Sequence, residues 1–585
     1  MLHRSSQSRF LATVLTLATL FAMVIARRTQ ADNLAAHIPA DAKAAAILND
    51  LKDLEEGLLG FARSSGLSEI GDEGFDGVGV FPEMSAEVEE GFEGIGVVLL
   101  ELPSDPFLNA KQLDAELMRE LVVFWKVKDV EKALTLLGAK RVGRFYEQEG
   151  EAFYLPVGNV LVGAVNEETL ARFEKSPRRI SERWSEEVAK LAATSDVFVW
   201  VDVQSAKPLI DKLSAMMTRE AIATYLHPQN LEGVTIENPQ RMAIQVRWLL
   251  DGLVWMMDQT ESASLGLSVD SERVTKRFRL TFVEGSTLGK RLESPPPAAA
   301  DLLAGLPASS FHFAYGCSND PFFKLFVEAI SSWVRLPNNE SDVSQQVRDI
   351  LITQYDAALE KMARQIVGGQ SNGMSMTREG AYASLGSLAV ADAAAYVSVS
   401  KTAQPLGSQL LNEQKLESLP DEDFDGRRVV RFRREPSTDA KGQEKVVEEA
   451  RDEYWTALSP TRVGHASGND VGMLKALQDQ ESRLADDPRL RRILADLPLR
   501  PHVVCFIDPF ELLGSVEVNG TLLSRTPFAA QMHMAPTASP IGTTLTLEKR
   551  AVSFTTVVRS ELIKASIGFF SAAVEPGGTV MPNAN

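Results

Sequence analysis

Three short sequences occur twice in this chain, and this internal similarity constrains its fold more than any other feature. The similar pairs are Arg141–Phe145 and Arg428–Phe432, Leu302–Pro307 and Ile493–Pro498, and Cys317–Phe322 and Cys505–Phe510. Self-similarity of this kind is typical of a repeated structural unit. A chain of 585 residues is also too long for one ordinary hydrophobic core. We therefore expect tandem, related modules.

The segment 294–300 marks the expected boundary between the modules. It contains three consecutive prolines, Pro295–Pro297, followed by alanines. Proline has no backbone N–H and its φ is fixed, so this run fits neither a helix interior nor a central strand. The sequence predicts a first domain over 32–293, a proline-rich linker over 294–300 and a second domain over 301–585.

Short apolar runs indicate the fold class. β-Branched and aromatic residues dominate several of them, among them Leu121–Val127 and Val503–Ile507. The expected hairpins are 265–269 with 274–282, 543–547 with 551–558, and 381–390 with 395–400; a strand is expected over 141–146 and a helix over 179–192. Short connections favour antiparallel pairing. We expect an α+β fold of two tandemly duplicated modules, each of mainly antiparallel sheet packed with helices.

The first 31 residues have the layout of a secretory signal peptide. Arg4 and Arg9 precede an apolar run over Phe10–Ala26, and small residues follow. We expect cleavage after Ala31 or, alternatively, after Ala26. The run is shorter than the about 20 residues of a spanning helix, and an uncleaved membrane anchor is the alternative. Export places the chain in the periplasm, at the cell envelope or outside the cell, with no stable transmembrane span after cleavage.

The chain that follows the signal is strongly acidic. The whole sequence has 79 acidic and 60 basic residues and a net charge of −19. The signal contains four arginines and no acidic residue, so the remainder has a net charge of −23. Binding to nucleic acid requires a concentrated basic surface. We therefore exclude nucleic acid as a main partner and expect the acidity to favour solubility.

The cysteines and histidines show no spacing typical of a zinc site or a nucleophile. Two cysteines, Cys317 and Cys505, are too few for a disulfide scaffold. A single disulfide between them is the alternative in an oxidising compartment. His312 and His502 precede the cysteines by different intervals, so we interpret them as ordinary strand residues. The sequence also has no Walker loop, nucleophile elbow or dinucleotide fingerprint, and we expect no cofactor.

Carboxylates follow apolar strands at Asp50, Asp202, Asp320 and Asp508. An aspartate at this place accepts backbone N–H groups at the start of a helix, and the proline after Asp320 and Asp508 fits the first helical position. We interpret these residues as N-caps. A catalytic or metal-binding pair of strand-end carboxylates is the alternative.

The segment 421–426 matches the first half of a calcium-binding loop. Asp421, Asp423 and Asp425 occupy the first, third and fifth positions, and Gly426 the sixth. The twelfth position is Phe432, which cannot coordinate calcium. The sequence predicts an acidic hairpin turn, with a weak metal site at the three aspartates as the alternative.

The most apolar internal segment contains Trp248, Trp255, Met256 and Met257. Flexible methionines and large aromatic rings line pockets for apolar ligands. We therefore take these four residues as candidate ligand contacts. Packing in the hydrophobic core explains the same residues without a ligand.

With the signal, the repeated Arg-Val-x-Arg-Phe sequences and the Leu-Pro pairs before apolar strands, the chain resembles the large exported proteins of unknown function of planctomycete-type bacteria. It is similar to domain-of-unknown-function families with tandem α+β repeats. The resemblance implies bacterial export and transfers no catalytic residue.

These patterns predict an exported, non-enzymatic binding or scaffold protein of the periplasm or cell envelope. Its expected partner is an envelope protein or an apolar small molecule. One alternative is a carrier of a lipid-like ligand, and another is a hydrolase whose site is assembled from scattered residues.

Overall fold

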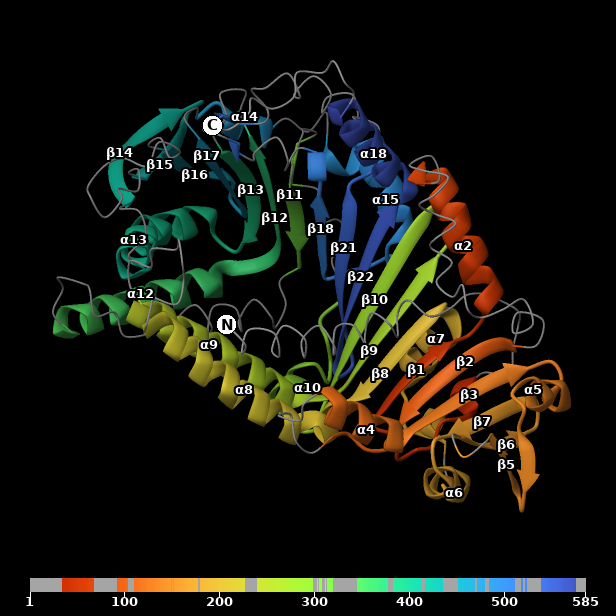
Figure 1. Cartoon of the computed structure of the whole chain (residues 1–585). Helices are drawn as coiled ribbons and strands as arrows, with labels where there is room; N and C mark the ends of the chain where they lie inside the picture. The colour runs from red at the N-terminus through yellow and green to blue at the C-terminus, as the bar shows by residue number, and fades with distance from the viewer. Residues whose placement is uncertain are drawn as a thin grey trace, which may run out of the picture. The chain divides into compact units, whose positions relative to one another are not determined.

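The computed structural model describes most of the chain after the predicted signal peptide (Figure 1). The described residues are 34–67, 92–103, 110–148, 150, 152–176, 179–226, 239–297, 302–303, 305–307, 311, 313–318, 345–376, 382–411, 416–434, 451–468, 471–478, 483–510, 517–518, 521–522 and 538–574. The signal peptide, His312 and Asp320 lie outside them.

The chain forms two compact units, each assembled from segments that are distant in sequence. The first comprises Met1–Ala215, Val254–Lys290 and Arg550–Ile567; the second comprises Met216–Leu253, Arg291–Lys549 and Gly568–Asn585. Segment 216–253 therefore clusters outside the unit that holds most of the predicted first domain. Segment 550–567 likewise clusters outside the unit that holds most of the predicted second domain.

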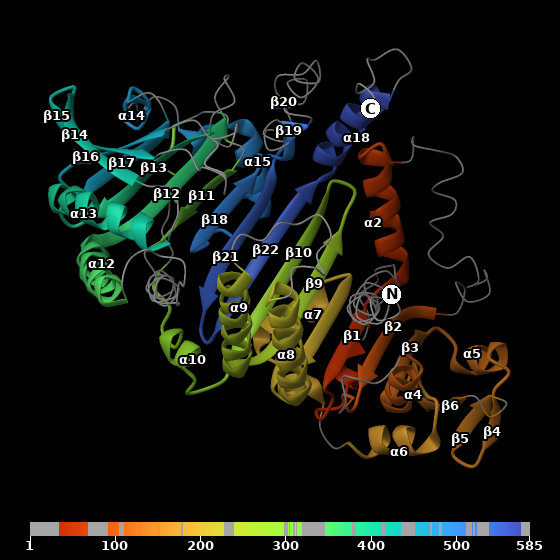
Figure 2. The same ribbon diagram turned by 60° about the vertical axis from the view of Figure 1, so that its left-hand side comes forward.

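The first unit contains an antiparallel sheet in the order β4-β5-β6-β7-β3-β2-β1-β8-β9-β10-β22. Its strands are β1 (Ala44–Leu48), β2 (Phe92–Leu99), β3 (Leu121–Val127), β4 (Lys140–Val142), β5 (Phe145–Gln148), β6 (Ala152–Val157), β7 (Val160–Ala164), β8 (Val197–Asp202), β9 (Thr260–Val269), β10 (Arg273–Phe282) and β22 (Ala551–Arg559). Among the described strands β22 is closest to the C-terminus, and it pairs with β10 in the sheet that contains β1 (Figure 2).

Several helical elements belong wholly or partly to the first unit. They are the 3-10 turns η1 (Leu34–His37) and η4 (Ile180–Glu182) and the helices α2 (Leu51–Ser64), α4 (Ala110–Glu120), α5 (Val130–Leu136), α6 (Glu167–Lys175), α7 (Glu186–Thr194), α8 (Val203–Leu226), α9 (Pro239–Gln259), α10 (Thr287–Arg291) and α18 (Ser560–Val574). The division between the units falls within α8, α9, α10 and α18. The core under the sheet is apolar and aromatic, with Phe124, Phe145 and Phe198 almost fully buried.

The second unit contains an antiparallel sheet in the order β14-β15-β16-β17-β13-β12-β11-β18-β21. Its strands are β11 (Phe313–Cys317), β12 (Ile366–Met376), β13 (Tyr382–Val390), β14 (Leu416–Phe424), β15 (Arg427–Arg434), β16 (Arg451–Ser459), β17 (Arg462–Gly468), β18 (Val503–Ile507) and β21 (Ile541–Glu548). A separate hairpin joins β19 (Glu517–Val518) and β20 (Thr521–Leu522).

The helices of this unit are α12 (Gln345–Gln365), α13 (Ala393–Leu411), α14 (Met473–Ala476) and α15 (Pro488–Asp496), with the 3-10 turn η6 (Leu484–Asp486). Helices α12 and α13 pack against each other (Figure 1). The core beside α13 contains Tyr396, Val430 and Phe432. Each unit therefore combines helices with an antiparallel sheet, which confirms the α+β class.

Three local predictions are wrong. The expected strand 141–146 is divided into β4 and β5, because Gly143 adopts a left-handed φ of +63°. The expected helix 179–192 is a 3-10 turn followed by α7, which starts at a new cap, Ser185. The expected strand 395–400 lies within helix α13, since tertiary packing against α12 overrides local β propensity.

In two of the three pairs of similar sequences, the two members do not occupy equivalent positions in the two units. Ile493–Asp496 ends helix α15, whereas Leu302, Leu303 and Gly305 lie in turns and Pro307 forms an isolated bridge with Arg483. Cys317 and Cys505 lie in the adjacent strands β11 and β18 of the second unit. Sequence similarity alone therefore matched a helix end with a segment of different structure in one case. In the other case it matched two strands that are neighbours in the same sheet.

Candidate functional site

The strand-end aspartates cap helices, as predicted. Asp50 Oδ1 accepts from the Lys52 N–H at 3.0 Å, Asp202 Oδ1 from the Ser205 N–H at 3.0 Å, and Asp508 Oδ1 from the Phe510 N–H at 3.1 Å. In each case the end of a buried strand places the carboxylate at the first free N–H groups of the next helical segment. One oxygen of each carboxylate is therefore already engaged.

The second carboxylate oxygen of Asp202 and of Asp508 accepts a hydrogen bond from an arginine. Arg183 donates to Asp202 Oδ2 at 3.2 Å and Arg489 donates to Asp508 Oδ2 at 3.2 Å, and in both pairs the arginine precedes the aspartate by 19 residues. Both aspartates are only 7% exposed. A general base must have an oxygen free to reach its substrate. These pairs instead tie Arg183, which precedes α7, and Arg489, in the first turn of α15, to the ends of strands.

A small cavity lies next to the first of these pairs. Its volume is about 30 Å³, and Arg183, Trp184, Trp200 and Glu261 are among the residues that line it. The indole N–H of Trp184 is buried and has no hydrogen-bond acceptor among the described protein atoms. A space of this volume accommodates about one water molecule. The cavity thus suits a bound water rather than a substrate.

The acidic turn forms the predicted hairpin, but the turn itself is narrower than expected. Asp425 and Gly426 have φ values of 52° and 72°, as a two-residue type I′ turn requires. Asp423 Oδ1 accepts from the Gly426 N–H at 3.0 Å. Asp421 lies within β14, so the three aspartates do not share one loop.

Cations neutralise Asp421. Its carboxylate contacts the Lys401 ammonium at 2.7 Å and the Arg428 Nε at 2.6 Å. The hydrogen bond from Lys401, together with Arg428, lowers the pKa of Asp421 below its usual value. Across the described residues, no group of three or more metal-ligating side chains is arranged to hold an ion.

The two cysteines are not joined by a disulfide. In the register of β11 and β18, Tyr315 lies opposite Cys505 and Cys317 lies opposite Val503, so the cysteines are diagonal neighbours. Diagonal positions are about 7–8 Å apart at Cα, which is too far for an unstrained disulfide. Burial raises the pKa of the Cys505 thiol to about 11, so the nucleophilic thiolate is scarce at neutral pH.

His502 does not serve as a base for Cys505, because both of its ring nitrogens are engaged. Nδ1 accepts from the Leu547 N–H at 3.0 Å, and Nε2 lies 2.7 Å from the Pro296 carbonyl oxygen. A neutral ring with the proton on Nε2 satisfies both contacts. The side chain is 4% exposed. His502 therefore fixes the proline-rich segment to β21.

A second histidine, His465 in β17, lies on the same sheet. The His465 ring stacks on Trp455 with centroids 4.8 Å apart. Its other side faces Gly386, where an added Cβ would lie 2.2 Å from His465 Cε1. Desolvation lowers the pKa of His465 from 6.5 to about 4. The ring is consequently neutral at physiological pH.

The low pKa of His465 predicts a pH-dependent stability of the second unit. The unfolded chain binds this proton below about pH 6.5, whereas the folded chain binds it only near pH 4. Unfolding is therefore favoured progressively as the pH falls from 6.5 to about 4, by at most about 3 kcal/mol. Urea titrations across this range should show that decline, and His465→Gln should reduce it. An equal slope in both proteins would contradict the assignment.

Of the four candidate ligand residues, Trp248 lies in the middle of helix α9 and the other three lie near its end. Trp255 is 43% exposed, and the neighbouring Leu249 and Leu253 are 51% and 52% exposed. Trp248, Met256 and Met257 are half-buried. The segment is therefore not a fully buried core helix.

Polar contacts anchor the end of α9 to the start of α8. Gln204 Nε2 donates to the Thr260 carbonyl at 2.6 Å, and Thr260 Oγ1 donates to the Met256 carbonyl at 2.8 Å. Lys207 contacts Asp258 at 2.8 Å. The backbone of this apolar segment is held in place while several of its side chains remain accessible.

A larger cavity lies between α12 and α13, where the sequence reasoning placed no site. It measures about 130 Å³ and is lined by apolar Leu359, Met362 and Leu416 and by polar Tyr355, Gln404, Ser408 and Arg434, besides Ala403 and Gly407. Glycine at 407 leaves room for Tyr355, whose ring atom Cε2 would lie 2.9 Å from an added Cβ. The sequence feature that could have indicated this cavity is the presence of Pro405 and Gly407, which lie inside helix α13.

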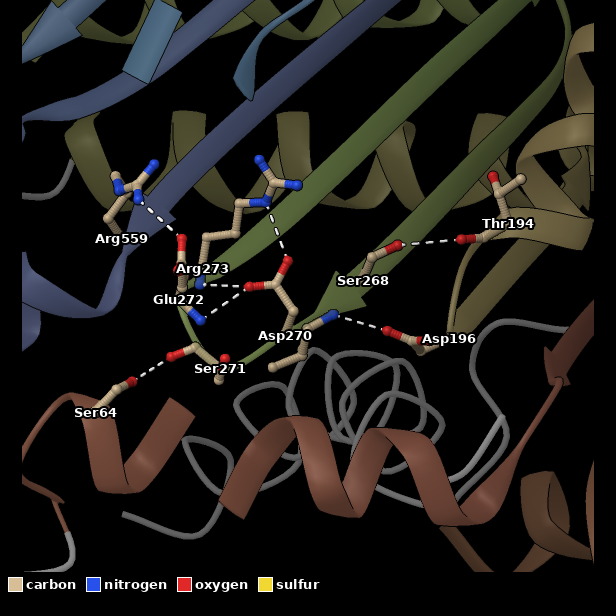
Figure 3. A network of polar contacts seen from close by, with 10 residues as sticks. Ser64, Thr194, Asp196, Ser268, Asp270, Ser271, Glu272, Arg273 and Arg559 are labelled. Atoms are coloured by element: carbon tan, nitrogen blue, oxygen red, sulfur yellow. Dashed lines mark hydrogen bonds and ion pairs between the residues drawn. The ribbon is translucent and has the colours of Figure 1, made fainter. Parts of the chain in front are cut away.

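A network of hydrogen bonds and ion pairs surrounds the turn between β9 and β10 in the first unit (Figure 3). Asp270 accepts from the backbone N–H groups of Glu272 and Arg273 at 2.9 and 3.0 Å. Three further contacts reach the turn from distant segments: Arg559 to Glu272, Asp196 to the Val269 N–H, and Ser64 to the Ser271 carbonyl. These partly exposed charges hold a turn in place, so the network is structural.

Comparisons with protein-family models, curated proteins and solved structures gave no match. Within the described residues, no helix is long and apolar enough to span a membrane.

Proposed function

We propose that this protein is an exported, non-enzymatic binding or scaffold protein of the periplasm or cell envelope, built from two copies of one α+β module. The observation that carries the proposal is the pair of buried aspartates, Asp202 and Asp508. Each strand-end carboxylate accepts from a helix N–H through one oxygen and from an arginine through the other.

The strand orders support the duplicated module. The order β4-β5-β6-β7-β3-β2-β1-β8-β9 of the first unit corresponds strand by strand to β14-β15-β16-β17-β13-β12-β11-β18-β21 of the second. The isolated bridges also correspond, because Pro39 pairs with Arg179 and Pro307 with Arg483. Such agreement over non-local contacts is typical of a repeated unit rather than of chance motif similarity.

The chemistry of the described side chains supports a non-enzymatic role. Cys505 is held as a thiol, both nitrogens of His502 are bonded, and Asp421 is neutralised by cations. A nucleophile needs an adjacent base with a free nitrogen or oxygen. None of these groups supplies that combination with the others.

Native mass spectrometry of the protein recovered from the exported fraction tests the proposal. We expect a mass that begins at Asp32, a defined complex with an envelope protein, and no turnover of ester, peptide or glycoside substrates. Saturable turnover that one point substitution abolishes would overturn the non-enzymatic role. A mass that retains residues 1–31 would overturn signal cleavage and leave the non-enzymatic role standing.

The exposure of α9 favours one second candidate, a carrier of an apolar ligand. Trp255, Leu249 and Leu253 expose apolar surface close together in sequence. Isolated exposed apolar residues are ordinary, whereas adjacent ones are typical of binding surfaces. The two cavities described above, of about 130 and 30 Å³, are smaller than the about 300–1,000 Å³ of most ligand pockets. A lipid-like ligand would therefore lie on α9 rather than in either cavity.

Trp255→Ala tests that placement. We expect it to weaken binding of an anilinonaphthalene sulfonate probe about tenfold, because contact with a large aromatic side chain contributes about 1.5–3 kcal/mol. Stability should change little, since Trp255 is 43% exposed. Leu136→Ala is the control, because Leu136 is 42% exposed on the separate helix α5. Equal probe affinity in the Trp255 variant and the parent would exclude α9 as the site.

A further inference from the structure

The cavity of about 130 Å³ beside α12 and α13 lies where two hydrophobic clusters of the second unit meet. Tyr355 and Leu359, on its wall, belong to one cluster together with Leu410. Met362 and Leu416, also on its wall, belong to the other cluster. Because members of both clusters line the space, the clusters do not close against each other at this place. A large part of the wall is therefore apolar.

Polar groups complete the wall. Gln404 lines the cavity from α13 and is half-buried, and its amide has both donor and acceptor atoms. Among the described residues that line the cavity, Arg434 on β15 is the one with a charge. Its Nε and Nη2 both donate to Glu453 Oε1, at 3.1 and 2.7 Å. Glu453 thus neutralises Arg434, and the wall offers hydrogen bonds without an unbalanced charge.

The part of α13 beside the cavity contains two residues that helix interiors disfavour. Pro405 has no N–H to donate within the helix. A Cβ added to Gly407 would lie 2.9 Å from Tyr355 Cε2 and 3.1 Å from the Tyr355 hydroxyl oxygen, so glycine allows α13 to approach α12 here. Local preferences of this kind are broken mainly at functional or strained places. The sequence of α13 therefore fits a cavity wall better than an uninterrupted helix.

This part of α13 is specific to the second unit. By strand order, the connection from β13 to β14 corresponds to the connection from β3 to β4 in the first unit. Helix α5 in that connection has 7 residues, whereas α13 has 19. Both helices start beside an aspartate that accepts backbone N–H groups, Asp129 and Asp392. Residues 400–411 therefore have no counterpart in α5, and they include every α13 residue of the cavity wall.

We propose that this cavity binds a small, neutral, single-ring aromatic molecule with one hydrogen-bonding group, such as a phenol. An apolar cavity of about 150 Å³ binds benzene, so a volume of about 130 Å³ suits one ring and is too small for a lipid chain. The ring would contact Leu359, Met362 and Leu416, and its polar group would face Gln404. A neutral molecule fits best, because Glu453 already neutralises the cation of the wall.

Calorimetric titration of the full mature chain with phenol tests the proposal, with toluene as the ligand of similar shape that lacks the hydroxyl group. We expect one phenol per chain with a dissociation constant of about 1 mM or lower, and weaker binding of toluene. Benzoate should also bind more weakly than phenol, because the wall does not balance its charge. No phenol binding to the parent chain would overturn the site, and tighter binding of benzoate would overturn the neutral class.

Gln404→Leu tests the polar contact, because it keeps a side chain of similar size and removes the amide. Phenol binding should weaken about threefold to tenfold, the effect of one lost hydrogen bond, while toluene binding stays the same. A purely structural change would instead weaken both ligands alike. Gln354→Leu is the matched control, since it makes the same replacement at an exposed position of α12 outside the cavity wall. Unchanged phenol affinity in Gln404→Leu would overturn the placement of the polar group.

Ala403→Leu tests whether the ligand occupies the cavity itself. Ala403 is 2% exposed and lines the cavity, so three added carbon atoms would take up space that the ring needs. We expect this variant to lose binding of both phenol and toluene. Amide hydrogen exchange of α13 in the absence of ligand establishes that the variant is folded. Parental phenol affinity in the folded Ala403→Leu variant would overturn the site.

Discussion

Replacing Asp508 by alanine should destabilise the second unit by about 2–3 kcal/mol. The substitution removes a helix cap, worth about 1 kcal/mol, and leaves Arg489 without one of its two carboxylates. Removing one partner of a buried ion pair is costly because the other charge stays desolvated. The loss stays below the about 3–5 kcal/mol of a fully orphaned pair, since Arg489 keeps its contact with Asp487 at 3.2 Å.

Urea unfolding followed by amide hydrogen exchange in β18 measures this effect within the second unit. Asp508→Asn should cost less, because asparagine also caps helices. Asp486→Ala is the control, since its pair with Arg491 is 55% and 63% exposed and such pairs contribute less than about 1 kcal/mol. Equal exchange protection of β18 in the Asp508→Ala variant and the parent would contradict the structural role.

The same substitution at Asp202 separates the structural role from catalysis. Asp202→Ala should destabilise the first unit by a smaller amount, about 1–2 kcal/mol, because Arg183 is 39% exposed and water replaces part of the lost contact. The hydrolase hypothesis predicts the opposite behaviour, namely lost turnover with unchanged stability. A folded variant without a parental activity would therefore move Asp202 or Asp508 from a structural to a catalytic role.

Replacing His502 by alanine should cost the second unit about 2–4 kcal/mol and release the segment around Pro296. The variant leaves the buried Leu547 N–H and the half-buried Pro296 carbonyl without their hydrogen-bond partners. Each unsatisfied group costs about 1–3 kcal/mol. Hydrogen exchange at Leu547 and proteolysis near residues 294–297 report the two losses separately.

Two conservative variants test separately the hydrogen bonds of the two ring nitrogens of His502. The amide oxygen of His502→Asn can replace Nδ1 as the acceptor for Leu547, whereas the longer side chain of His502→Gln reaches toward the position of Nε2. We expect the Asn variant to protect the Leu547 amide and the Gln variant to protect the proline-rich segment. Parental protection at both places in His502→Ala would show that neither bond holds the segment.

Local elements followed from local chemistry. The strands 121–127 and 503–507 were predicted with the ends that the structure has. Asp129 and Asn166 cap helices as their side chains require. These predictions rest on residues within about four positions of one another. The interruption between β4 and β5 at Gly143 was not predicted, because a β-rich sequence pattern does not reveal a positive φ.

Only part of the candidate site could be predicted from the sequence. The capping aspartates were identified, but the arginines that hold them were not, since each pair joins residues 19 positions apart. The three aspartates at 421, 423 and 425 left a weak metal site as the alternative to an acidic hairpin turn. The structure instead gives Asp421 to Lys401 and Arg428 on other elements. Charge partners depend on which strands become neighbours, and composition does not specify that.

The sequence by itself determined the acidic character of the chain, the α+β class, the hairpin at 425–426 and the helix caps. All of these depend on single residues or on short-range hydrogen bonding. Only the tertiary structure decided that β22 joins β10 and that Cys317 is a diagonal neighbour of Cys505. The physical reason is that strand order is set by burial summed over whole sheets, which brings together residues separated by up to several hundred positions.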